Sequence, residues 1–157
     1  MVDSFPVPAC RRGRSHRCRV LSGLCSYSYD EGARGFFYGL RAHLLVAWPG
    51  VVVGASLSPA NAHDLRAAED LLEGGGGSGF GWILGDRNYW SPELARSLRL
   101  RGIVLLAPHK NPKSERHPWP RWLMQKRRRV ETVIGQLVGR YNAKRVWARD
   151  GWHPRSR

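Results

Sequence analysis

The sequence has few cysteines and no long hydrophobic run. No apolar stretch approaches the roughly 20 residues of a transmembrane helix, and no signal-peptide pattern is present, so we expect neither a membrane protein nor a secreted one. The 3 cysteines are closely spaced and odd in number, which does not predict a disulfide framework and fits a reducing cytoplasm. Cys10, His16, Cys18 and Cys25 match no common zinc-ligand spacing, so free thiols near the core are preferred over a zinc site.

Acidic residues are also scarce. The chain of 157 residues has 12 Asp and Glu against 26 Lys and Arg, a net charge of +14. Residues 108–157 alone have 14 basic and 3 acidic residues, a net charge of 14 − 3 = +11. Such a field attracts a polyanion, and the phosphate backbone of nucleic acid is the usual one. A membrane surface is the less favoured partner, because no helix combines a basic face with a large apolar face.

The hydrophobic pattern predicts one α/β domain over residues 1–157. Strands are expected over residues 1–7, 36–48, 51–57, 82–86 and 103–107, with Pro49 and Gly50 at the centre of a tight turn. Helices are expected over residues 63–73, from Ser91 to Gly102, and over 121–141. Short turns favour three antiparallel strands and helical crossovers favour two parallel ones. The prediction is a mixed five-stranded sheet with helices on its faces.

Two irregular segments interrupt this pattern. Residues 74–81 contain six glycines, but no Lys-Ser/Thr pair follows and a strand comes next, so a flexible linker is favoured over a phosphate-binding loop. Residues 108–120 form a basic, proline-rich loop. In the last helix the apolar stripe is expected to consist of Val130, Val133, Ile134, Leu137 and Tyr141.

Three acids stand out against this background. Asp86 lies at the end of the buried strand expected over residues 82–86, Asp3 lies within the apolar first strand, and Glu131 lies on a basic helix. If the first strand lies beside the strand at residues 82–86, the three carboxylates meet and suit divalent cations that act on phosphodiesters. Taken singly, Asp3 is a strand-end acid and Glu131 a solvated helix acid paired with Arg127 or Arg128.

Five blocks of sequence carry a resemblance to a known family. They are VDSFPV at 2–7, YGLRAH at 38–43, SPANAHD at 58–64, GDRNY at 85–89 and RVETVIGQL at 129–137. In this order they resemble the transposases of bacterial insertion sequences that have a ribonuclease H-like catalytic domain, and among these the insertion sequence 982 family. The resemblance extends over nearly the whole chain.

The resemblance implies a ribonuclease H-like fold and a DDE triad of Asp3, Asp86 and Glu131. The triad would bind two Mg²⁺ ions, for which Mn²⁺ can substitute, hydrolyse a terminal phosphodiester and join the freed 3′-hydroxyl to target DNA. No small-molecule cofactor is implied. The implied partners are transposon ends, target DNA and a second copy in a homodimer, and the implied location is the nucleoid of a bacterial cytoplasm.

The chain departs from the family at both ends. Such transposases have an N-terminal DNA-binding region before the first acid and a helical tail after the last one, so we expect a catalytic domain cut from a longer protein, or a decayed copy. Two alternatives therefore stay open. One is a DNA-binding remnant without catalysis, and the other is a ribonuclease H-like nuclease without strand transfer.

Polar, basic and aromatic residues near these blocks are candidates for DNA contact. Two histidines in the blocks are expected either to face the site or to be structural. The basic residues are expected to bind phosphates, with a solvated basic face as the alternative. The expected DNA-contacting set is Arg41, His43, Asn61, His63, Arg87, Lys126, Arg127, Arg128, Arg129, Arg140, Lys144 and Arg145. Base stacking is a further hypothesis for four tryptophans, with core or dimer packing preferred: Trp119, Trp122, Trp147 and Trp152.

Overall fold

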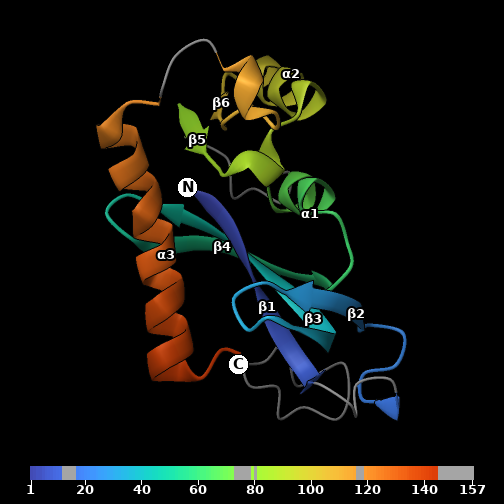
Figure 1. Cartoon of the computed structure of the whole chain (residues 1–157). Coiled ribbons are helices and arrows are strands. Elements are labelled where there is room, and N and C mark those ends of the chain that lie inside the picture. Colours follow the sequence, from blue (N-terminus) through green and yellow to red (C-terminus); the bar gives the residue numbers. More distant parts are fainter. Residues whose placement is uncertain (12–16, 73–78, 80, 116–118, 145–157) are drawn as a thin grey trace.

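An antiparallel sheet, a parallel pair of strands and three α-helices make up the described part of the chain (Figure 1). The computed structural model describes residues 1–11, 17–72, 79, 81–115 and 119–144. The strands are β1 (Val2–Arg11), β2 (Ser26–Asp30), β3 (Gly35–Ala47), β4 (Val51–Pro59), β5 (Trp82–Leu84) and β6 (Val104–Leu106). The helices are α1 (Asp64–Leu71), α2 (Pro92–Leu100) and α3 (Arg121–Tyr141), with short 3₁₀ turns η3 (Arg87–Tyr89) and η4 (Pro112–Ser114).

The central strand of the antiparallel sheet is β3. It pairs with β1 along one edge, where Asp3 lies opposite Leu44 and Ser4 opposite His43. The other edge of β3 is shared end to end by β2 and β4. Gly39 lies where three strands meet, and a Cβ there would collide with the backbone of β1 at Val7, so only glycine fits.

The two faces of this sheet are covered by different helices. Neighbouring residues of a strand point to opposite faces. On one face Phe5 and Leu44 pack against Val130 of α3. On the other, Val2 and Leu45 pack against α1, α2 and the parallel pair. In Figure 1, α3 accordingly runs along one side of the sheet, while α2, β5 and β6 lie beyond the start of β1.

The predicted single sheet of five strands differs from the observed arrangement. The leading strands are antiparallel and β5 and β6 are parallel, as predicted, but they belong to two separate sheets. Strand β1 reaches the parallel pair through side chains, with Val2 in the same core cluster as Ile83. The sheet also contains β2, which the prediction lacked. Each parallel strand has 3 residues, so side-chain packing replaces an extended ladder.

Helix boundaries follow the local signals closely. Ser91 accepts a hydrogen bond from the Leu94 amide and caps α2, and Gly102, at φ 74°, follows its end. The predicted bounds of α3 are confirmed. In its apolar stripe Val130 is buried, but Tyr141 is 73% exposed because it lies at the last residue of the helix.

Local features of one helix start and one turn complete the fold. The cap of α1 is His63, whose side chain accepts a hydrogen bond from the Leu65 amide. The turn between β3 and β4 is closed by the Gly50 amide donating to the Ala47 carbonyl, so Gly50 ends the turn instead of occupying its centre. Much of the predicted linker at 74–81, and residues 116–118 of the basic loop, lie outside the described residues.

No helix among the described residues is long and apolar enough to cross a membrane.

Candidate active site

Asp3 lies on β1, on the face of the sheet that α3 covers. Its Oδ1 accepts a hydrogen bond of 2.8 Å from the Ser4 amide. Burial raises the pKa of the Asp3 carboxyl to about 6, against the opposing effect of this hydrogen bond. The charges of Asp86 and Glu131 raise it further and that of Arg127 lowers it, so these four side chains act on one another electrostatically.

Asp86 follows β5 after Gly85 and caps the turn η3. Its Oδ1 accepts from the Asn88 backbone amide at 2.9 Å, and its Oδ2 accepts from the Asn88 side-chain amide at 3.2 Å. Burial raises the pKa of Asp86, while the hydrogen bond from Asn88 and the charge of Arg127 oppose this shift and the charge of Asp64 adds to it. The end of β5 thus places Asp86 within electrostatic range of Asp3.

Glu131 approaches from α3 and is 51% exposed. Its Oε1 forms an ion pair of 3.0 Å with Arg127, one helical turn earlier. This is the pairing expected of a solvated helix acid, and it occurs within electrostatic range of Asp3. Glu131 therefore makes the ion pair of the structural alternative, and its charge also acts on Asp3.

A second polar cluster lies on the opposite face of the same strands, around Asp64 at the start of α1. Asp64 is 11% exposed and contacts Nη1 of Arg41 at 3.4 Å through both oxygens. The Ser4 hydroxyl donates to Asp64 Oδ1 at 3.3 Å, and His43 Nδ1 lies 3.9 Å from the same oxygen. The sequence reasoning passed over Asp64 as a site residue, although it closes the third block of the resemblance.

His43 is completely buried at 0% exposure, and its Nε2 lies 2.8 Å from the Ser58 hydroxyl. Burial lowers its pKa, which favours the neutral imidazole. A DNA strand has no access to this side chain. The burial therefore removes His43 from the expected DNA-contacting residues and supports the structural alternative.

Replacing Asp64 by Asn should lower the free energy of unfolding by about 1–3 kcal/mol, because the change leaves the half-buried Arg41 guanidinium without its charge partner. Urea denaturation measures the effect. Asp70→Asn, an identical change at an exposed position of α1, is the matched control. Equal stabilities of the two variants would contradict this role of Asp64.

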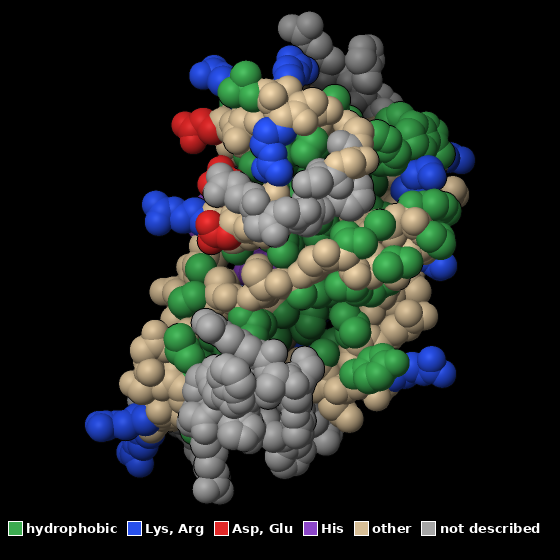
Figure 2. Space-filling view, turned by 180° about the vertical axis from the view of Figure 1, so that it is seen from behind, with side chains coloured by type: hydrophobic (Ala, Val, Ile, Leu, Met, Phe, Trp, Pro, Cys, Tyr) green, Lys and Arg blue, Asp and Glu red, His purple; other side chains and the backbone are tan. Residues whose placement is uncertain are grey.

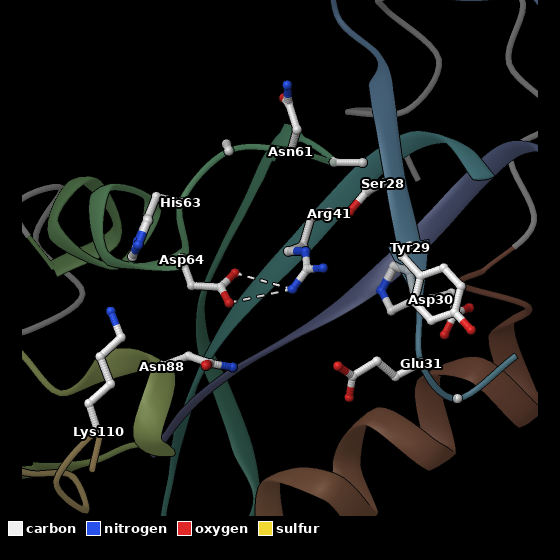
Figure 3. Close-up of a pocket in the computed structure, with 14 residues that line it drawn as sticks. Ser28, Tyr29, Asp30, Glu31, Arg41, Asn61, His63, Asp64, Asn88 and Lys110 are labelled. Carbon is white, nitrogen blue, oxygen red and sulfur yellow. Dashed lines mark hydrogen bonds and ion pairs between the residues drawn. The ribbon is translucent and has the colours of Figure 1, made fainter. Parts of the chain in front are cut away.

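Polar side chains from β2, β3 and the α1 region surround a cleft of about 520 Å³ (Figure 3). Three of the expected DNA-contacting residues line it: Arg41, Asn61 and His63. Asn88, which holds Asp86, also lines the cleft. We refer to Asp3, Asp86 and Glu131 as the acidic cluster. The polar cleft adjoins this cluster at Asp86, through Asn88.

Residues 1–145 match the family model described as Transposase DDE domain. The chain belongs to this family. The matched range includes Asp3, Asp86 and Glu131, and the family implies a transposase function with DNA as the partner. Searches of curated proteins and of solved structures gave no match.

DDE transposases generally use divalent metal ions, and the donor chemistry of this DDE domain fits such ions. Asp3, Asp86 and Glu131 offer carboxylate oxygens, the ligands that hard cations prefer. Their charges raise the pKa of Asp3, so a cation among them would relieve repulsion. Within the described residues, however, no three His, Cys, Asp or Glu side chains form a group that could hold a metal ion. The Arg127 ion pair and the Asn88 hydrogen bonds occupy two of the three acids.

On the face seen in Figure 2, most Lys and Arg side chains lie apart from one another near the edges and form no single patch. On α3, Lys126 lies 4.1 Å from the Trp48 ring centroid and Arg129 donates to the Pro49 carbonyl, so both contact the β3–β4 turn. The exposed cations among the expected set are Arg87, Arg128, Arg129 and Arg140, while Lys144 is half-buried.

The remaining predictions concern tryptophans, cysteines and residues outside the described part of the chain. Trp119 donates its indole N–H to Glu115 at 3.0 Å, and Trp122 is 54% exposed. Among the described residues, Cys10, Cys18 and Cys25 form no disulfide bond. The other predicted residues, His16, Arg145, Trp147 and Trp152, lie outside the described part of the chain.

Proposed function

We propose that this DDE domain is the catalytic domain of an insertion-sequence transposase of the insertion sequence 982 type. It would hydrolyse the phosphodiester at an element end and join the freed 3′-hydroxyl to target DNA. The observation that supports this proposal is the electrostatic coupling of Asp3 to Asp86 and Glu131 in a chain of net charge +14. Burial and neighbouring like charges raise the pKa of Asp3, and carboxylates with such raised pKa values favour a functional role.

In this proposal Asp3, Asp86 and Glu131 hold two Mg²⁺ ions, which Mn²⁺ can replace. The bound ions would supply charge stabilisation to the attacking and leaving oxygens of the phosphodiester. Asn88 orients Asp86 through two hydrogen bonds. Arg127, now paired with Glu131, would be released to a DNA phosphate when that carboxylate turns to a cation.

The test uses a DNA end with a pre-cleaved 3′-hydroxyl, its sequence taken from candidate terminal inverted repeats in the genomic sequence on either side of the reading frame. With Mg²⁺ and a supercoiled plasmid, the proposal expects joined products. Cleavage of an intact end without joining would favour the nuclease that lacks strand transfer. Binding of the end without either reaction would favour the DNA-binding remnant, which the present Arg127–Glu131 pairing also supports.

DNA affinity is expected to depend on the basic residues of α3, among them the half-buried Arg127 and the exposed Arg128. Replacing Arg127 and Arg128 by Ala should weaken duplex binding of every sequence alike and lower the slope of log K against log salt by up to ~1.8, since each phosphate contact releases ~0.9 counterion. Fluorescence anisotropy at several salt concentrations measures the slope.

The matched control replaces Arg66 and Arg99, two exposed arginines on α1 and α2, by Ala. This variant loses the same charge and should keep the wild-type slope. An equal fall of the slope in both double variants would mean that net charge alone, and not α3, binds the phosphates.

A further inference from the structure

The cleft in Figure 3 lies between the end of β2 with its following turn and a wall formed by the start of α1, η3 and the segment after β6. Its volume of about 520 Å³ is in the range of small-molecule sites, roughly 300–1,000 Å³. A double helix is too wide for such a space, whereas a single nucleotide is of the right size. The lining is mostly polar, which suits a ligand with many hydrogen-bonding groups.

Three of the charged groups in this lining are already paired. Asp30 forms an ion pair of 3.2 Å with Arg11 and accepts from the Ala33 amide, while Arg41 is paired with Asp64. These pairs fix the floor and one wall of the cleft.

The side chains of Glu31 and Lys110 have no hydrogen-bond or ion-pair partner within the described part of the chain. In Figure 3 the Glu31 carboxylate points across the cleft toward Asn88, and the Lys110 amine lies on the opposite wall near His63. The cleft therefore offers an anionic acceptor on one side and a cationic donor on the other. A phosphate is attracted to the Lys110 side and repelled from the Glu31 side.

We propose that this cleft binds one unpaired nucleotide, with its phosphate at Lys110 and His63 and its base at Glu31. A carboxylate accepts hydrogen bonds from the amino groups of cytosine or adenine, which thymine lacks. Tyr29 is 45% exposed and is braced by Phe36 at a ring distance of 5.2 Å, so it offers a stacking surface beside Glu31. The preferred ligand is therefore an unpaired nucleotide with an amino-bearing base.

The position of the cleft connects this ligand to the proposed reaction. Asn88 lines the cleft and hydrogen-bonds both oxygens of Asp86. An unpaired nucleotide in the cleft would therefore lie next to the acidic cluster, as a strand separated near a reacting phosphodiester would. This inference rests on the proposed function for its biological role, but the binding itself needs neither metal nor catalysis.

The test uses two fluorescein-labelled pentanucleotides, one of five deoxycytidines (dC5) and one of five thymidines (dT5). Their binding is measured by fluorescence anisotropy without divalent metal. Wild type should bind dC5 more tightly than dT5. Lys110→Ala should weaken both by about tenfold, because a charge-assisted contact to phosphate is lost. The matched control is Lys113→Ala, which removes a lysine that does not line the cleft and should have little effect.

Glu31→Gln provides the second arm, because Glu31 is exposed and the substitution keeps the size of the side chain. It should reduce the preference for dC5 over dT5, because the Gln amide accepts from cytosine through its oxygen and can also donate to the O4 acceptor of thymine through its nitrogen. Competition with free dCMP separates the two sources of the ligand: equal potency to dC5 identifies a mononucleotide, and weak competition identifies a strand.

Two results would overturn the proposal: equal losses for Lys110→Ala and Lys113→Ala, or an unchanged base preference in Glu31→Gln. Nicking of duplex DNA with Mg²⁺ is measured in parallel on the same variants. Wild type that nicks but shows no Lys110-dependent binding of dC5 refutes the cleft alone. Wild type that binds dC5 through Lys110 but never nicks refutes the catalytic proposal alone.

Discussion

Replacing Asp86 by Asn should reduce metal-dependent nicking of duplex DNA by at least about a hundredfold. The proposed metal ions contribute several kcal/mol to stabilising the charge of the transition state, and each ~1.4 kcal/mol is a factor of ten in rate. Asn has the same size and retains one oxygen that can accept the Asn88 amide, so η3 should keep its start. The measurement is single-turnover nicking of a labelled duplex with Mg²⁺.

The matched control is Asp70→Asn, the same chemical change at an exposed position of α1. It should nick at the wild-type rate. Affinity for duplex DNA should be unchanged or slightly higher in Asp86→Asn, because a negative charge near the phosphates is lost. Retention of nicking by a folded Asp86→Asn variant would remove Asp86 from the proposed triad.

Replacing Asp3 by Asn should stabilise the metal-free protein at pH 8 by about 2–3 kcal/mol. The pKa of Asp3 is about 6 in the fold against an ordinary value of 3.8. Between these values the folded state binds more protons than the unfolded state, so the free energy of unfolding falls as pH rises through this window. Above pH 6 the whole pKa shift of Asp3 lowers the free energy of unfolding, by ~1.4 kcal/mol for each pKa unit.

The variant lacks this charge and should show no such fall, so wild type and Asp3→Asn should have similar stabilities near pH 4. Urea denaturation in EDTA at pH 4, 6 and 8 measures the difference, with Asp70→Asn as the control for surface charge. Millimolar Mg²⁺ should raise the melting temperature of wild type, because a cation offsets the repulsion, and should raise that of Asp3→Asn much less. Parallel pH profiles for wild type and Asp3→Asn would contradict this account.

The elements that the sequence predicted well are those whose signals are local. Ser91 and Gly102 bound α2 because a cap and a left-handed residue act within one turn of a helix. The long apolar run of β3 is extended whatever its partners are. Strand β2 was missed because Tyr27 and Tyr29 alternate with serines and form no apolar run, and its partner on β3 follows only from the fold.

The candidate site was likewise predictable only in part. The sequence singled out Asp3 and Asp86 as acids in apolar strand contexts, and the two carboxylates lie within electrostatic range of each other in the fold. Their role in a DDE triad stays a prediction. The Asp64 cluster was not predictable, because it depends on which face of β1 and β3 each residue occupies and on where α1 docks. The burial of His43 has the same origin: its position on the strand pattern permits either exposure or burial, and α1 covers it.

Asp3 and Ser4 are neighbours in β1, and they serve opposite faces of the sheet. One peptide bond therefore joins the acidic cluster beside α3 to the Asp64 cluster beneath α1, through the 3.3 Å hydrogen bond of Ser4. Substitutions at Asp3 and Asp64 share this peptide and should be non-additive in a double-mutant cycle, whereas residues on two faces of a sheet are usually independent. Any redesign of one face has to treat the other as part of the same thermodynamic unit.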